Sequence, residues 1–154
     1  MPGVRYRVKP HPTQGWIFER LVVPDVKNIA NLLGRVIIGK IENPDLVDRI
    51  ISSTPMVLED PGWRCYHWVE NALAKLNATG GRAITPARAA LKTDQVLSFD
   101  ADGKIIPAFD FPKLMAFSRD YMEGKIVHGR YTCYEVVDSP RPTYSMLSKK
   151  QIWK

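Results

Sequence analysis

The segment Asp60-Pro-Gly-Trp-Arg-Cys-Tyr-His-Trp-Val-Glu-Asn-Ala-Leu-Ala-Lys-Leu76 carries the clearest helical pattern in the chain. Its apolar residues recur at i, i+3, i+4, i+7, i+8 and i+11, namely Cys65, Trp68, Val69, Ala72, Leu73 and Leu76. This spacing predicts an amphipathic helix whose apolar stripe faces the main core. Asp60 is expected to cap the helix, and Gly80-Gly81 to end the segment. Cys65 would then face inward in the first turn, where the positive end of the helix dipole favours a thiolate.

The overall composition is that of one globular domain spanning residues 1–154. Hydrophobic residues make up 45% of the chain, but no apolar run approaches the roughly 20 residues that cross a membrane. The two cysteines, Cys65 and Cys133, are too few for a disulfide framework, and no Cys/His spacing suits zinc. We therefore expect a reduced, cytoplasmic location and no cofactor or metal. The net charge of +6 comes from scattered basic residues, so a nucleic-acid partner is not favoured.

The first half of the chain reads as two strands, a third strand and a helix. Residues 4–8 alternate apolar and charged side chains, and residues 15–23 are predicted to form a second strand after a Pro- and Gly-containing loop, so the pair is expected to be an antiparallel hairpin. Residues 35–41 are rich in β-branched side chains and are predicted to form one central strand. Asn43-Pro44 begins a helix whose inward face is Leu46, Val47, Ile50 and Ile51.

The second half of the chain is predicted to form smaller elements. Residues 95–99 and 104–109 suggest a hairpin that turns at Asp102-Gly103. A helix over 110–124 is expected to start at the cap residue Asp110 and stop at Gly124. A late strand over 130–137 and an extended tail over 138–154, laid across the surface, complete the chain. The predicted class is α+β: a small, mostly antiparallel sheet packed by two or three helices.

Several pieces of the sequence together resemble a known family. They are, in order, Gly3-Val-Arg-Tyr6, Trp16-Ile-Phe-Glu19, Gly34-Arg-Val-Ile-Ile-Gly-Lys-Ile41, the segment from Trp63 to Leu73, and Pro142-Thr-Tyr144. This order resembles small uncharacterised fungal proteins that share a tryptophan-x-cysteine-x-x-tryptophan-valine helix. Residues 82–109 lie outside the resemblance and are interpreted as an insertion.

That fungal family is, in turn, distantly similar to circularly permuted papain-like cysteine hydrolases. The similarity implies a permuted papain-like core and matches Cys65 to the nucleophilic cysteine. In such enzymes a histidine on an early strand comes before the cysteine. The relatives' Tyr-His-Trp strand has no counterpart before Gly3 here, so the core is expected to lack its first strand.

A cysteine hydrolase needs a base within hydrogen-bond reach of its thiol. His67 follows Cys65 by two residues on the same predicted helix, so the two side chains diverge by about 200°. His11, in a Pro-flanked loop, and His128, before the late strand, remain as base candidates. Because free cysteine is among the most buried residue types, a packed core thiol is the favoured interpretation of Cys65, and an active nucleophile is the alternative.

The favoured function is therefore a degenerate cysteine-hydrolase-like domain that acts by binding a protein or a small molecule. Its candidate contacts are Arg5, Arg7, Trp16, Trp63 and Tyr66. The simpler interpretation makes the tryptophans core anchors. Arg5, Arg7 and Lys9 alternate on one side of the first strand, with Arg35 and Lys40 on a neighbouring strand. The simpler interpretation of these basic residues is a solvated sheet face, and the alternative is an anion-binding surface for phosphate or carboxylate groups. The alternative function is a thiol-dependent hydrolase or acyltransferase, for instance in fungal secondary metabolism. A sheet edge left by the missing strand would also suit a homodimer.

Overall fold

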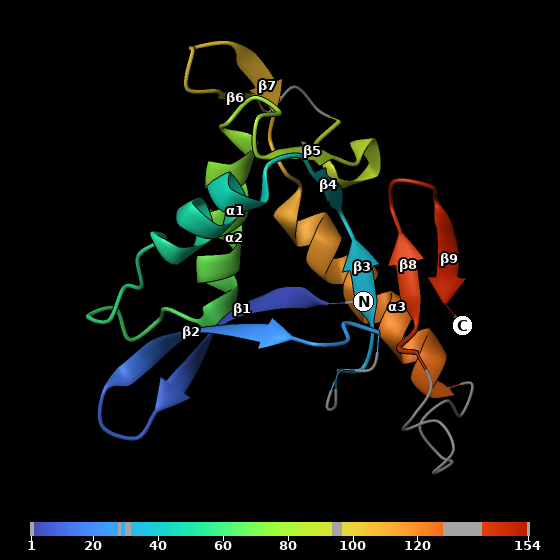
Figure 1. The fold of residues 1–154 in the computed structure, drawn as a ribbon, viewed down its shortest axis with the longest axis horizontal. Helices are drawn as coiled ribbons and strands as arrows, with labels where there is room; N and C mark the ends of the chain where they lie inside the picture. Colours follow the sequence, from blue (N-terminus) through green and yellow to red (C-terminus); the bar gives the residue numbers. More distant parts are fainter. Residues whose placement is uncertain (1, 28, 30–31, 94–96, 128–139, 154) are drawn as a thin grey trace.

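The computed structural model describes residues 2–27, 29, 32–93, 97–127 and 140–153 (Figure 1). Three α-helices and several small sheets make up this part of the chain. In chain order the elements are β1 (Gly3–His11), β2 (Gly15–Val23), β3 (Arg35–Ile37), β4 (Gly39–Ile41), α1 (Pro44–Ser52), α2 (Cys65–Asn77), β5 (Ile84–Pro86), the 3-10 turn η1 (Arg88–Ala90), β6 (Leu97–Phe99), β7 (Ile105–Pro107), α3 (Phe111–Val127), β8 (Thr143–Ser145) and β9 (Lys150–Trp153). The α+β class is confirmed.

The predicted N-terminal hairpin is confirmed. Strands β1 and β2 pair antiparallel from Gly3 opposite Val23 to His11 opposite Gly15. Gly15 has φ +75°, a left-handed conformation that closes the loop and favours glycine. One face of the hairpin carries Val8 and Phe18, which pack on Trp68, the tryptophan of α2.

Residues 35–41 do not form the single central strand that their composition predicts. The run breaks at Ile38 into β3, which pairs parallel with β8, and β4, which pairs antiparallel with β5. The crossing between sheets depends on Gly39, because a Cβ there would lie 3.0 Å from the Thr85 carbonyl oxygen. Within the described residues β3 lies at the edge of its sheet, and β8 takes the middle position.

Helix α1 begins as its sequence predicts. The Asn43 side chain accepts a hydrogen bond of 3.0 Å from the Leu46 backbone N–H, and Pro44 takes the first helical position. Val47 is buried in the main core, against which Leu46, Ile50 and Ile51 also pack.

Helix α3 starts after Asp110, whose carboxylate accepts from the Lys113 backbone N–H at 3.2 Å. The helix does not stop at Gly124 but continues to Val127. Leu114 is buried, and the rings of Phe117 and Tyr121 meet that of Tyr144 on β8. This contact joins α3 to the C-terminal sheet (Figure 1).

The C-terminal segment is extended, but it is not a surface tail. Thr143 on β8 is 0% exposed and Ser145 is 3% exposed, because β8 lies between β3 and β9. Part of the predicted insertion also lies in the main core: Ala83, Ile84, Ala87 and Ala90 are buried there together with Phe109. The predicted β6–β7 hairpin is confirmed, with Gly103 at φ +77° in its turn. The predicted strand over 130–137 lies outside the described residues.

Candidate functional site

Cys65 is exposed, in contrast to the buried thiol that its helical spacing predicts. It is the first residue of α2. The apolar space near this end is filled instead by Trp63, which clusters with Trp68 and Val8. The buried stripe of α2 is therefore Trp68, Ala72 and Leu76, while Val69 is also exposed.

The start of α2 is organised by a histidine rather than by Asp60. The carboxylate of Asp60 accepts from the Gly62 backbone N–H at 2.7 Å and so closes the preceding turn. The helix cap is Arg64, whose backbone N–H donates to His67 Nδ1 at 3.0 Å. His67 thus takes the place of the Glu or Gln in a capping box, and its Nδ1 is an acceptor with no capacity left for a thiol proton. The sequence feature that could have predicted this cap is the position of His67, three residues after the cap residue Arg64.

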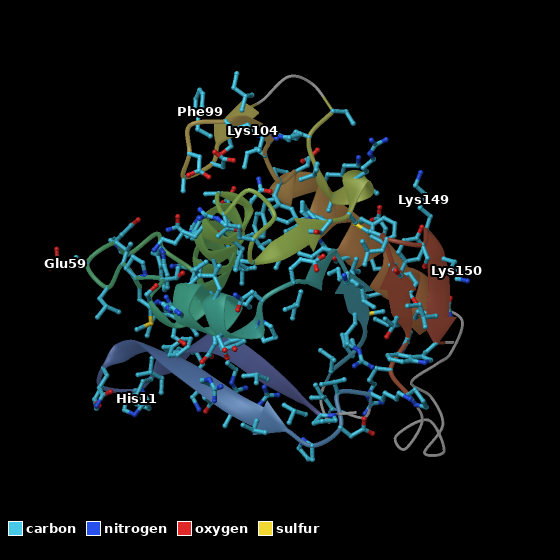
Figure 2. All side chains as sticks on the ribbon, turned by 45° about the horizontal axis from the view of Figure 1, so that its top comes forward. His11, Glu59, Phe99, Lys104, Lys149 and Lys150 are labelled. Carbon is cyan, nitrogen blue, oxygen red and sulfur yellow. The ribbon has the colours of Figure 1, made fainter. Side chains whose placement is uncertain are left out.

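Neither remaining histidine is brought to Cys65 in the described part of the chain. His11 ends β1, and its Nδ1 lies 3.3 Å from the Thr13 hydroxyl at the turn end of the hairpin (Figure 2). Cys65 has no hydrogen bond with any described residue. His128 and Cys133 lie outside the described residues. A thiol–imidazole pair is therefore not formed among the residues that the structure describes.

The candidate aromatic contacts do not line one groove. Trp63 is only 4% exposed and meets Trp16 edge to face, with ring centroids 5.4 Å apart. Tyr66, by contrast, is 44% exposed, and its ring centroid lies 4.2 Å from that of His67. Trp16 and Trp63 are thus core anchors, as the simpler interpretation has it, and Tyr66 lies apart from them.

The candidate basic surface is largely neutralised within the hairpin. Arg7 and Lys9 on β1 both bind the Glu19 carboxylate on β2, the lysine at 2.7 Å. The hydrogen bond from Arg7, and to a lesser extent that from Lys9, lowers the pKa of Glu19 to about 2. Arg5 lies on the same face of β1, with its Nε buried and without a hydrogen bond to the described residues. The anion surface predicted from this alternation therefore already holds a carboxylate.

Arg35 and Lys40 do not extend that surface. Arg35 belongs to β3, in the sheet formed with β8 and β9, and Lys40 on β4 binds Glu42 at 3.0 Å. The single basic face over neighbouring strands is thus not formed.

A groove lies between the hairpin and α1, and sequence reasoning missed it. Its volume is about 300 Å³. The residues that line it are Gly3, Val4, Tyr6, Arg20, Ile41, Pro44, Asp45, Val47 and Asp48. Four elements, β1, β2, β4 and α1, thus contribute to it (Figure 1).

A hydrogen-bonded triad forms one wall of this groove. Tyr6 Oη and Arg20 Nε both donate to Asp48 Oδ1, each at 2.7 Å. The pKa of Asp48 is lowered mainly by its hydrogen bond from Arg20 and, to a lesser extent, by that from Tyr6. The pKa of Tyr6 is raised mainly by desolvation and, to a lesser extent, by its hydrogen bond to Asp48. The only sequence sign was that Tyr6 shares the inward face of β1 with Val8.

A second, smaller cavity of about 190 Å³ lies between α2 and the β7–α3 connection. Its wall includes Leu73, Phe109 and Phe111, together with Asn77, whose Nδ2 donates to the Pro107 carbonyl at 2.8 Å. No group of three or more metal-ligating side chains occurs in the described residues, and no helix there is long and apolar enough to span a membrane.

Comparison with known proteins gives a family but no function. A search of curated proteins and a search of solved structures each find no match to this chain. One family profile matches, and it covers residues 1–153, which include the hairpin, the groove and α2. The chain therefore belongs to DUF6914, a family of unknown function.

Proposed function

We propose that this domain is a binding module that holds a small, mainly apolar and uncharged ligand in the groove between the hairpin and α1. The observation that supports the proposal is the combination of an apolar groove with a fixed polar triad at its wall. This replaces the aromatic and basic contacts expected from the sequence, and it keeps the expectation that the domain acts by binding.

The size and lining of the groove define the class of ligand. Its volume of about 300 Å³ is at the lower end of the range for small-molecule sites, so a small molecule or one side chain of a peptide fits, but a helix does not. Val4, Ile41, Pro44 and Val47 supply the apolar wall. Val4 and Ile41 are 39% and 57% exposed, so a ligand would remove apolar surface from water.

The polar groups favour a neutral ligand. Arg20 and Asp48 form an ion pair at 2.7 Å and neutralise each other. Asp45 at the groove has no ion pair in the described part of the chain and leaves one negative charge there. A carbonyl or hydroxyl group of the ligand could therefore bind Arg20, whereas a carboxylate would be repelled by Asp45.

The proposal is tested with indole as a neutral apolar probe. Titration followed by amide chemical shifts should perturb residues of β1, β4 and α1 around the groove. Ile41→Arg should abolish these changes, because it places a charge in the apolar wall. Leu58→Arg is the matched control, since Leu58 is 58% exposed and lies outside the groove, and it should bind indole like the wild type. Equal binding by Ile41→Arg, or no saturable binding by the wild type, would refute the proposal.

The second candidate function is a thiol-dependent hydrolase or acyltransferase, and one observation supports it. Cys65 is exposed at the first residue of α2, where a substrate can reach it. The likeness to fungal relatives and to permuted papain-like hydrolases belongs to this candidate. It requires that an ester substrate such as p-nitrophenyl acetate be cleaved with a burst of product, and that Cys65→Ser remove the burst. A rate equal to that of free cysteine would leave only the binding function.

A further inference from the structure

The smaller cavity lies against one face of α2 and shares no lining residue with the groove. On the helix side its wall consists of residues at i, i+3, i+4 and i+7, namely Glu70, Leu73, Ala74 and Asn77. The other side of the wall comes from the residues around the β6–β7 hairpin and the start of α3, namely Lys92, Ser98, Ala108, Phe109 and Phe111.

Backbone hydrogen bonds hold the two sides of this cavity together. The Ala101 N–H donates to the Ala78 carbonyl at 2.8 Å, which ties the β6–β7 hairpin to the C-terminal end of α2 (Figure 1). The Lys92 N–H donates to the Ala108 carbonyl at 2.9 Å and so fixes the segment that follows β7. The cavity is therefore preformed, as small-molecule sites usually are.

Asn77 places a polar group in the cavity wall. The residue is 6% exposed, and its Nδ2 donates to the Pro107 carbonyl at 2.8 Å, which fixes the orientation of the amide. Its Oδ1 makes no hydrogen bond with a described residue. The Ser98 hydroxyl is likewise without a hydrogen bond in the described part of the chain. The wall thus offers an acceptor and a hydroxyl that the described fold does not use.

Two opposite charges line the same cavity without pairing. Neither the Glu70 carboxylate nor the Lys92 ammonium group forms an ion pair with a described residue. Their charges cancel in sum, but each attracts an opposite charge on a ligand. Leu73, Phe109 and Phe111 supply the apolar part of the wall. A matching ligand therefore carries one positive charge, one negative charge and a small apolar group.

We propose that this cavity binds a small aliphatic α-amino acid. The ammonium group of the amino acid donates to Asn77 Oδ1 and is attracted by Glu70. Its carboxylate binds Lys92 and accepts from the Ser98 hydroxyl, while its side chain contacts the apolar wall. The volume of about 190 Å³ limits the size, because a cavity of about 150 Å³ holds one benzene molecule. An aromatic amino acid is thus too large. This site is separate from the groove and does not depend on its function.

The test is calorimetric titration with L-valine and with two analogues that each lack one charged group. Isovalerate lacks the ammonium group of valine, and isobutylamine lacks its carboxylate. The wild type should bind valine at one site and each analogue at least about fivefold more weakly, since one charged contact is missing. Absence of saturable valine binding, or equal affinity for valine and both analogues, overturns the proposal.

Charge variants assign each end of the ligand. Glu70→Gln should weaken valine by about threefold or more but should not weaken isovalerate, which has no ammonium group to lose. Lys92→Gln should weaken valine but not isobutylamine, for the corresponding reason. Glu123→Gln and Lys75→Gln, at exposed residues that do not line the cavity, are the matched controls and should bind valine like the wild type. Equal losses in the variants and their controls would reduce the effect to net charge and overturn the site.

A steric variant places the ligand inside the cavity. Ala74→Trp should fill the cavity and abolish valine binding, whereas Lys75→Trp adds the same ring at the neighbouring exposed position and should leave it unchanged. Ile41→Arg, which alters the groove, should also leave valine binding unchanged, so the two sites can fail independently. Valine binding that survives Ala74→Trp, or that is lost in Ile41→Arg, would place the ligand elsewhere and overturn the proposal.

Discussion

The Tyr6 hydroxyl donates a 2.7 Å hydrogen bond to the Asp48 carboxylate. This hydrogen bond joins β1 of the N-terminal hairpin to helix α1. Arg20, the partner of Tyr6 across the hairpin, donates to the same oxygen. The carboxylate thus fixes the angle between β1, β2 and α1, and with it the width of the groove. Three side chains that no local pattern connects define this wall.

Tyr6→Phe should lower the free energy of unfolding by about 1 kcal/mol, because one hydrogen bond to a partly exposed charged group is lost. The pKa of Asp48 should rise towards its ordinary value at the same time, since Tyr6 is one of the groups that lower it. Urea denaturation and carboxylate-detected NMR titration measure the two effects. Tyr66→Phe is the control, because Tyr66 is 44% exposed and its hydroxyl has no hydrogen bond in the described residues. Equal effects of the two substitutions would argue against the triad.

Glu19 should contribute to stability in a pH-dependent way. Its pKa is about 2 in the folded protein, below its ordinary value of 4.5, so its stabilising contribution is fully present above pH 4.5. This contribution is lost as the pH falls from 4.5 towards 2, because the unfolded state takes up a proton first. Glu19→Gln should therefore flatten the pH dependence of the melting temperature in this window. Glu59→Gln, at an exposed residue without an ion pair in the described part of the chain, should keep the wild-type slope.

Cys65 should react in the native protein, in contrast to the buried thiol that its spacing in the sequence predicts. In a Cys133→Ser background, iodoacetamide should modify Cys65 completely before unfolding, at a rate within about tenfold of that of free cysteine. Mass spectrometry measures the modification. Protection until denaturant is added would mean that the first turn of α2 is packed inward after all.

His67 should stabilise the start of α2. His67→Ala removes the acceptor for the Arg64 backbone N–H and should cost about 1 kcal/mol. His67→Gln should recover part of this loss, because glutamine can accept the same hydrogen bond. Chemical denaturation of the wild type and the two variants measures the free energy of unfolding. An unchanged free energy of unfolding in His67→Ala would show that this cap does not stabilise the helix.

Trp68 should be the most sensitive of the tryptophans. It is 3% exposed, and its indole Nε1 donates to the Thr54 carbonyl at 3.1 Å, which ties α2 to the end of α1. Trp68→Phe leaves a cavity and an unpaired carbonyl and should cost about 2–4 kcal/mol. Trp16→Phe, at a half-buried ring without such a hydrogen bond in the described residues, should cost clearly less. Thermal denaturation ranks the two.

Features determined by neighbours along the chain could be predicted from the sequence. The cap at Asn43-Pro44, the turn at Asp102-Gly103 and the alternation in the first hairpin each depend on a few adjacent residues. Backbone conformation and helical or strand periodicity act at that range, so fold class and most elements follow from them. The same reasoning predicted that Trp63 and Trp68 are buried anchors.

Only the tertiary structure decided where these elements meet. The split of residues 35–41 depends on β8 and β5, which come much later in the chain, and the exposure of Cys65 depends on Trp63 filling the space near its turn. Glu19 occupies Arg7 and Lys9 because two strands pair in one register, and Asp48 meets Tyr6 because α1 packs on the hairpin. Such contacts are set by packing between distant segments. The periodicity of residue types along the chain does not determine which faces of distant helices and strands pack against each other.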